Sequence, residues 1–172
     1  MSYQSKCVYG FASDVCSLQI RPDIDEIIIK NFLTPSLKKQ FDKFVTENFD
    51  TTCELKEKLD NFIANTCEET TDNERDDIKN IIGTFIDDYE SETGLHDGWE
   101  GLMVDIINEK EFNKQVVFNY DNCTVFVEPY IPVDSEEKAL LPTQTDIQKI
   151  VSKYFGQLTN EPITVKWLTI ST

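Results

Sequence analysis

The most concentrated chemistry in this chain is that of carboxylates. Residues 68–105 contain thirteen Asp and Glu side chains against two basic ones, Arg75 and Lys79, and so carry −11 of the total net charge of −16. Residues 1–67 carry −2 and residues 106–172 carry −3. Such a surface attracts basic groups and repels the phosphates of nucleic acids and anionic membranes. We therefore expect a basic protein partner, and no direct binding to nucleic acid or to a membrane.

The spacing of these carboxylates indicates one helix with an acidic side. From about residue 72 to 89, apolar residues recur at the intervals of a buried helical face. Asp76-Asp77 and Asp87-Asp88 are eleven residues apart, so we expect both pairs to project outward, about 16 Å apart along the axis. The candidate partner-binding residues are Asp72, Glu74, Asp76, Asp77, Asp87, Asp88, Glu90, Glu92, Asp97 and Glu100.

A charge run is more often a solvated face than a binding site, and that alternative remains. A function is favoured because the charge is concentrated in one segment, whereas the segments on either side contain nearly equal numbers of acidic and basic residues. Carboxylates on a rigid helix would fill a Lys/Arg groove built for phosphates, and such binding weakens with salt.

His96-Asp97 is the one pair with catalytic character, because an imidazole beside a carboxylate binds metal or transfers a proton. A metal enzyme would need further ligands at defined spacing, and His96 is the only histidine. The adjacent aspartates could hold Mg²⁺ or Ca²⁺, but neighbours on a helix point about 100° apart. We therefore expect no catalytic residue, metal or cofactor, and keep a metal-dependent enzyme around His96 as a third hypothesis.

The composition fits a cytoplasmic globular protein. With 40% apolar and 11% aromatic residues, a chain of 172 residues can bury a core as one domain. The five cysteines form no CxxC pair, which is typical of a reducing compartment. The N-terminus lacks the apolar segment of a secretion signal, and no run is long enough to span a membrane.

The elements that must position the carboxylates follow from periodicity and capping signals. Residues 6–12 alternate as a strand, and residues 33–92 form a mainly helical insertion. Before it, a helix is expected from Pro22 to Phe32, although the run Ile27-Ile28-Ile29 also permits a strand. Residues 98–172 are expected to form a helix (99–109), a hairpin (114–130), a helix from Thr143 or Thr145, and a last strand (163–170).

The predicted fold class is α+β, as a single domain over residues 1–172. In it a small antiparallel sheet, made of the N-terminal strand, the C-terminal β-hairpin and the last strand, packs with four to six helices. The helical insertion carries the acidic surface.

Residues 98–170 also carry a pattern that resembles a protein family. The matching segments are Gly101-Leu102, Ile106–Glu109, Glu137–Leu140, Thr143, Ile147–Tyr154 and Leu158–Ile163. They resemble the tail of small acidic proteins of phages and mobile elements of gut Firmicutes. The match departs at Val133-Asp134-Ser135, where the family has an aromatic residue after the prolines. The resemblance implies a bacterial host cytoplasm and, by analogy of size and charge, an anti-defence role like that of anti-CRISPR proteins.

These observations lead to three hypotheses for the function, ranked by how well they fit. The leading one is a phage-type inhibitor that binds a nucleic-acid-handling host defence complex, a CRISPR–Cas effector or similar, through an acidic surface that mimics DNA. The alternative is a non-inhibitory acidic interaction module of a phage or mobile element. The metal-dependent enzyme around His96 is the third.

Overall fold

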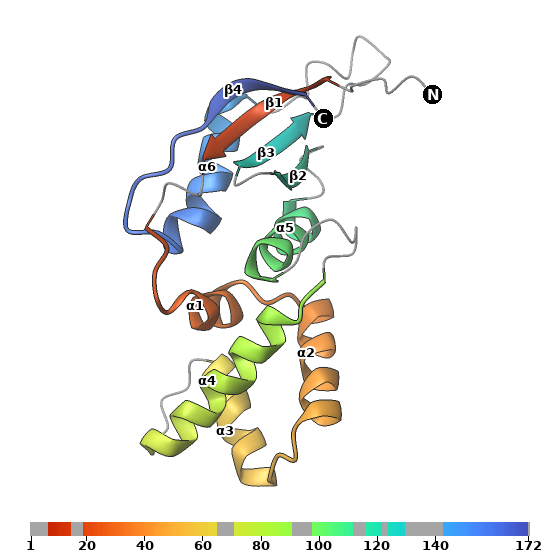
Figure 1. The fold of residues 1–172 in the computed structure, drawn as a ribbon, viewed down its shortest axis with the longest axis vertical. Helices are drawn as coiled ribbons and strands as arrows, with labels where there is room; N and C mark the ends of the chain where they lie inside the picture. The colour runs from red at the N-terminus through yellow and green to blue at the C-terminus, as the bar shows by residue number, and fades with distance from the viewer. Residues whose placement is uncertain are drawn as a thin grey trace. The chain divides into compact units, whose positions relative to one another are not determined.

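The computed structural model describes residues 7–14, 19–64, 71–90, 98–111, 116–121, 124–129 and 143–171, with side chains for 19–64, 71–90, 98–111 and 143–166 (Figure 1). The chain's internal contacts group it into two compact units, each described separately. We call Pro22–Ile106 the helical unit, and Met1–Arg21 with Ile107–Thr172 the sheet unit. The division falls within one helix, α5 (Gly98–Glu111).

The helices of the helical unit begin where capping residues satisfy free backbone N–H groups. Its other helices are α1 (Ile24–Asn31), α2 (Pro35–Asn48), α3 (Cys53–Ile63) and α4 (Asp72–Asp87). Thr34 and Thr52 accept hydrogen bonds from the backbone N–H of Leu37 and Leu55, at 3.3 and 3.2 Å. Thr71 and Glu74 form a capping box at the start of α4.

The helical unit builds its core from one apolar stripe on each helix. Ile28 of α1, Phe41 of α2 and Ile82 of α4 are fully buried, and Leu59 of α3 nearly so. The ring of Phe85 packs edge-to-face against the rings of Phe41, Phe44 and Tyr89, with centroids 4.9, 5.4 and 6.0 Å away. α4 contacts both α1 and α2, so the acidic helix is fixed by packing on its apolar side.

The sheet unit contains a four-stranded antiparallel sheet in the order β2-β3-β1-β4 (Figure 1). The strands are β1 (Cys7–Asp14), β2 (Val116–Asp121), β3 (Thr124–Pro129) and β4 (Lys166–Ser171). Phe11 of β1 lies opposite Val127 of β3 on one side and Trp167 of β4 on the other.

Helix α6 (Gln144–Tyr154) and the 3₁₀-helix η3 (Phe155–Gln157) complete the sheet unit. The side-chain amide of Gln148 donates to the carbonyl of Ile163 at 2.7 Å and accepts from the N–H of Val165 at 2.8 Å. Residues 163–165 therefore bond to a helix side chain, which is why the last strand begins at Lys166 and not at Ile163 as expected.

The expected fold class, an α+β domain built on a small sheet, is wrong for most of this chain, because the sheet is confined to one of the two units. Of the residues whose side chains are described, 74% are helical. All the elements described between Pro22 and Ile106 are helices, and the sheet is confined to the other unit. The physical reason is that the apolar stripes of these helices complete a core among themselves and need no sheet to cover them. Ile28 and Ile29 are fully buried in a helix, so the alternative strand at that run is not formed.

Within the part of the chain that is described, no helix has the length and apolar content needed to cross a membrane.

Candidate protein-binding surface

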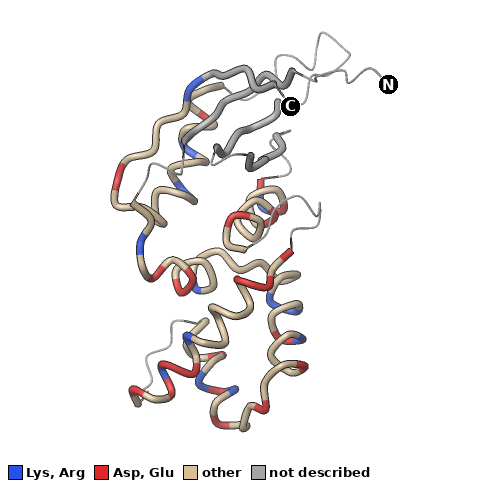
Figure 2. The backbone as a smooth tube through the Cα atoms, viewed as in Figure 1, with Lys and Arg blue, Asp and Glu red and all other residues tan. Residues whose placement is uncertain are grey.

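Most of the predicted partner-binding carboxylates that the structure describes are exposed. We define the acidic face as the exposed carboxylates of α4 and of the residues after it: Asp72, Asp76, Asp77, Asp87, Asp88 and Glu90. Figure 2 shows acidic residues toward both ends of α4. Glu74 and Glu100 are half-buried. Glu92, Asp97 and His96 lie outside the described residues.

The acidic face exists because the opposite side of α4 is buried. Ile78, Ile81, Ile82, Phe85 and Ile86 form its apolar stripe and are at most 5% exposed. Residues three and four positions apart share a helix side, and the aspartates before Ile78 and after Ile86 lie off the positions of this stripe, so they point away from the core and are exposed. The carboxylates are thus held on a helix whose backbone is fixed by tertiary packing.

Glu74 differs from its neighbours because it is already paired. Its carboxylate bonds the ammonium group of Lys58 on α3 and accepts from the backbone N–H of Thr71 at 2.8 Å. The pairing with Lys58, together with the Thr71 bonds, lowers the pKa of Glu74 to about 2. Glu74 therefore anchors the start of α4, and we do not count it in the acidic face.

Asp25 and Glu26 of α1 adjoin this surface, and sequence reasoning missed them. A Cβ at Gly83 of α4 would lie 3.8 Å from Oδ2 of Asp25, which places this carboxylate against the helix. Burial raises the pKa of Asp25, and the charges of Asp87 and Glu26 raise it further. The adjacent acids in the first turn of α1 were a visible signal, but their spacing does not say which helix they meet.

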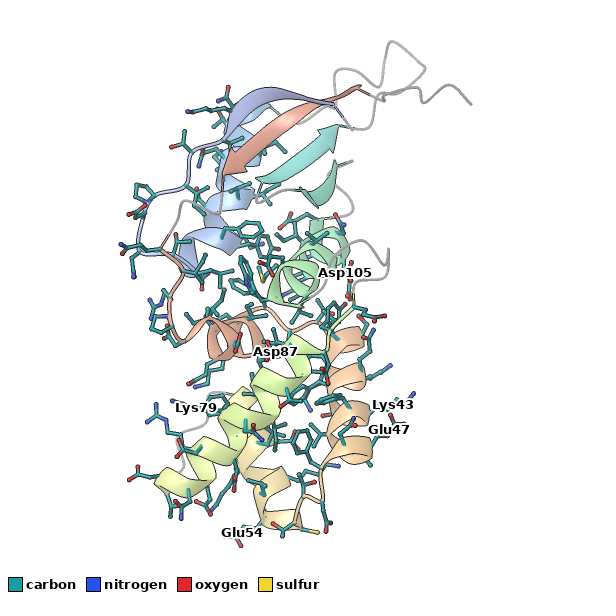
Figure 3. All side chains as sticks on the ribbon, in the orientation of Figure 1. Lys43, Glu47, Glu54, Lys79, Asp87 and Asp105 are labelled. Carbon is teal, nitrogen blue, oxygen red and sulfur yellow. The ribbon has the colours of Figure 1, made fainter. Side chains whose placement is uncertain are left out.

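A cavity of about 300 Å³ opens beside this contact. Its lining combines three acidic side chains with one ammonium group and two apolar side chains, namely Asp23, Asp25, Glu26, Lys79, Pro22 and Ile82. Lys79 Nζ lies 3.4 Å from Glu26 Oε1, so the one cation of the lining is engaged by α1. Figure 3 labels Lys79 and Asp87 on α4.

Few cations reach the acidic face. Among the described residues, the ion pairs of Lys38, Lys43, Lys58 and Lys79 run to carboxylates of α1, α2 and α3, or to Glu74. None of these ion pairs includes a member of the acidic face. The charge therefore remains available to a partner.

Most of the negative net charge of the chain lies in one of its two units. The helical unit contains 22 acidic and 8 basic residues, a net charge of −14, and the sheet unit contains 10 and 8, a net charge of −2. The long-range field that would steer a basic partner thus originates in the helical unit.

The described part of the chain contains no set of side chains that could bind a metal ion. No group of three or more His, Cys, Asp or Glu side chains there could hold an ion. His96, on which the enzyme hypothesis depends, lies outside the described residues.

Comparison with known proteins leaves the chain without a relative from which to infer function. No family model, curated protein or solved structure matches it. The resemblance to small acidic proteins of phages and mobile elements therefore stays a prediction from the pattern of residues 98–170.

Proposed function

We propose that this chain is a phage-type inhibitor that binds a nucleic-acid-handling defence complex of the bacterial cytoplasm through its acidic face. The partner is a protein or ribonucleoprotein with a Lys/Arg groove for a phosphate backbone, such as a CRISPR–Cas effector. The chain occupies this groove and excludes the nucleic acid. No catalytic residue or cofactor takes part.

One observation carries the proposal: the carboxylates of the acidic face project from one packed helix and the three residues that follow it, and they join no ion pair among the described residues. Asp76 and Asp87 are about 16 Å apart along the axis by helical rise. Charges held in this way lose little conformational freedom on binding and steer association with a basic groove. A merely solubilising surface requires neither the rigidity nor the concentration of charge in one unit.

Competition with nucleic acid tests the proposal. Purified RNA-guided effector complexes and other defence nucleases would be loaded with fluorescently labelled DNA, and the chain would be titrated against each. We expect DNA to be displaced from at least one complex, with a matching loss of cleavage. Binding without displacement or loss of cleavage would instead identify a non-inhibitory interaction module. Inhibition with the DNA still bound would mean that a conformation is locked, and it would contradict mimicry.

A further inference from the structure

The contact between α1 and α4 contains two carboxylates of like charge. Asp25 projects from the first turn of α1 onto α4 beside Gly83, one turn before Asp87. Asp25 is half-buried and Asp87 is exposed. Like charges close to a partly buried interface repel each other more strongly than they would in water.

The other charged groups around Asp25 do not remove this repulsion. Its neighbours at the start of α1 are Asp23, which precedes the helix, and Glu26, both acidic. On α4 the nearby cation is Lys79, and its ammonium group pairs with Glu26 at 3.4 Å. Helix α3, which also packs on α1, presents the ring of Phe62 to the ammonium of Lys30 at 3.5 Å. No cation of the described residues forms an ion pair with Asp25.

We propose that the carboxylates of Asp25 and Asp87 form a charge-sensitive element of the helical unit. Repulsion between them loosens the packing of α1 on α4 at neutral pH, and this packing tightens when positive charge neutralises the carboxylates. A proton supplies this charge at acidic pH. A cationic side chain of a bound partner does the same at neutral pH, through the cavity that Asp25 lines. The role of a partner rests on the proposed function, whereas the response to protons does not.

The direction of the pH effect follows from the raised pKa of Asp25. A carboxyl group that binds its proton more tightly in the folded state destabilises that state when ionised. The cost is therefore present at neutral pH. It declines as the pH falls through the raised folded pKa toward the ordinary value of 3.8, below which the carboxyl is protonated in both states.

Thermal unfolding of the full chain, together with hydrogen exchange of the α1 amides, tests the inference. We expect Asp25→Asn to raise the Tm by about 2–4 °C at pH 7.5 and to slow hydrogen exchange in α1. Near pH 3.5 the variant and the wild type should have the same Tm and the same exchange rates in α1. Asp77→Asn, which neutralises an exposed carboxylate elsewhere on α4, is the matched control and should leave α1 exchange unchanged.

A double-mutant cycle isolates the pair from other effects of each substitution, including the loss of a charge that favours the α1 dipole. We expect Asp87→Asn to add little once Asp25→Asn is present. Additive effects of the two substitutions at pH 7.5, or an Asp25→Asn gain that persists undiminished at acidic pH, would overturn the inference. Because these experiments use no partner, their failure would leave the proposed inhibition untouched.

Discussion

The ammonium group of Lys58 on α3 bonds the carboxylate of Glu74 on α4, so one of the predicted partner-binding residues is instead part of the framework. Thr71 completes this arrangement, because its hydroxyl also donates to Glu74, at 2.9 Å. The start of the acidic helix is thus fixed both by its own cap and by a neighbouring helix.

Replacing Glu74 by Gln should lower the Tm at pH 7 by about 2–4 °C, because it removes the ion pair with Lys58 and a negative charge in the first turn of α4. The pKa of Glu74 is lowered from 4.5 to about 2 in the folded protein, so its contribution is complete above pH 4.5 and is lost as the pH falls toward 2. The wild-type and Glu74→Gln melting curves, measured by circular dichroism, should therefore converge near pH 2. Glu57→Gln, an exposed change on α3, is the control; an equal loss of Tm from it would refute the assignment.

Tyr154→Phe should destabilise the sheet unit more than Tyr89→Phe destabilises the helical unit. The Tyr154 hydroxyl donates to the carboxylate of Glu111 at 2.8 Å, and both residues are buried. Lys153 also bonds that carboxylate, at 2.9 Å. Loss of a hydrogen bond to a buried charge costs about 1.5–3 kcal/mol.

Tyr89 is the matched comparison, since its hydroxyl donates to Asp105 at the same distance of 2.8 Å but in a partly exposed setting. Its loss should cost about 0.5–1.5 kcal/mol. Urea denaturation of both variants measures the difference, and equal or reversed costs would show that burial of Glu111 does not strengthen its bond.

Salt should weaken partner binding steeply. The acidic face would make several charge contacts with a basic groove. Dissolved salt weakens the attraction between such charges, with a screening length of about 8 Å at physiological ionic strength. Once a complex that binds the chain is in hand, its Kd measured between 50 and 300 mM NaCl should rise by at least about tenfold. A Kd that does not change with salt would indicate an apolar interface.

Much of the helical unit could be predicted because its signals are local. Apolar residues at helical spacing predicted α4, which begins directly after its cap, Thr71. Thr143, one of the two predicted starts of the last helix, is the residue that caps α6. Each signal lies within a few residues of the helix that it begins.

The features that could not be predicted depend on contacts between distant residues. Nothing local shows that Lys58 meets Glu74, or that the first turn of α1 meets the end of α4. The fold class was wrong for the same reason, because periodicity identifies a buried face but not what covers it. The sequence also does not show that the side chain of Gln148 hydrogen-bonds the backbone of Ile163 and Val165.

The most direct test of the central claim is charge reversal on the acidic face with a charge-matched control. The test variant changes Asp76, Asp77, Asp88 and Glu90 to Lys, and the control changes Glu47, Asp50, Glu57 and Glu161 to Lys. All eight residues are exposed, and each variant raises the net charge from −16 to −8. Asp72 is kept because a lysine in the first turn opposes the helix dipole, and Asp87 is kept because it lies near Asp25.

The measurement is displacement of labelled DNA from a defence complex that the wild-type chain inhibits, with the fold of both variants confirmed by circular dichroism. We predict that the test variant loses at least about a hundredfold in affinity, whereas the control stays within about threefold of the wild type. Equal displacement by the test variant and the wild type, or equal losses in both variants, would contradict the claim that the acidic face is the binding site.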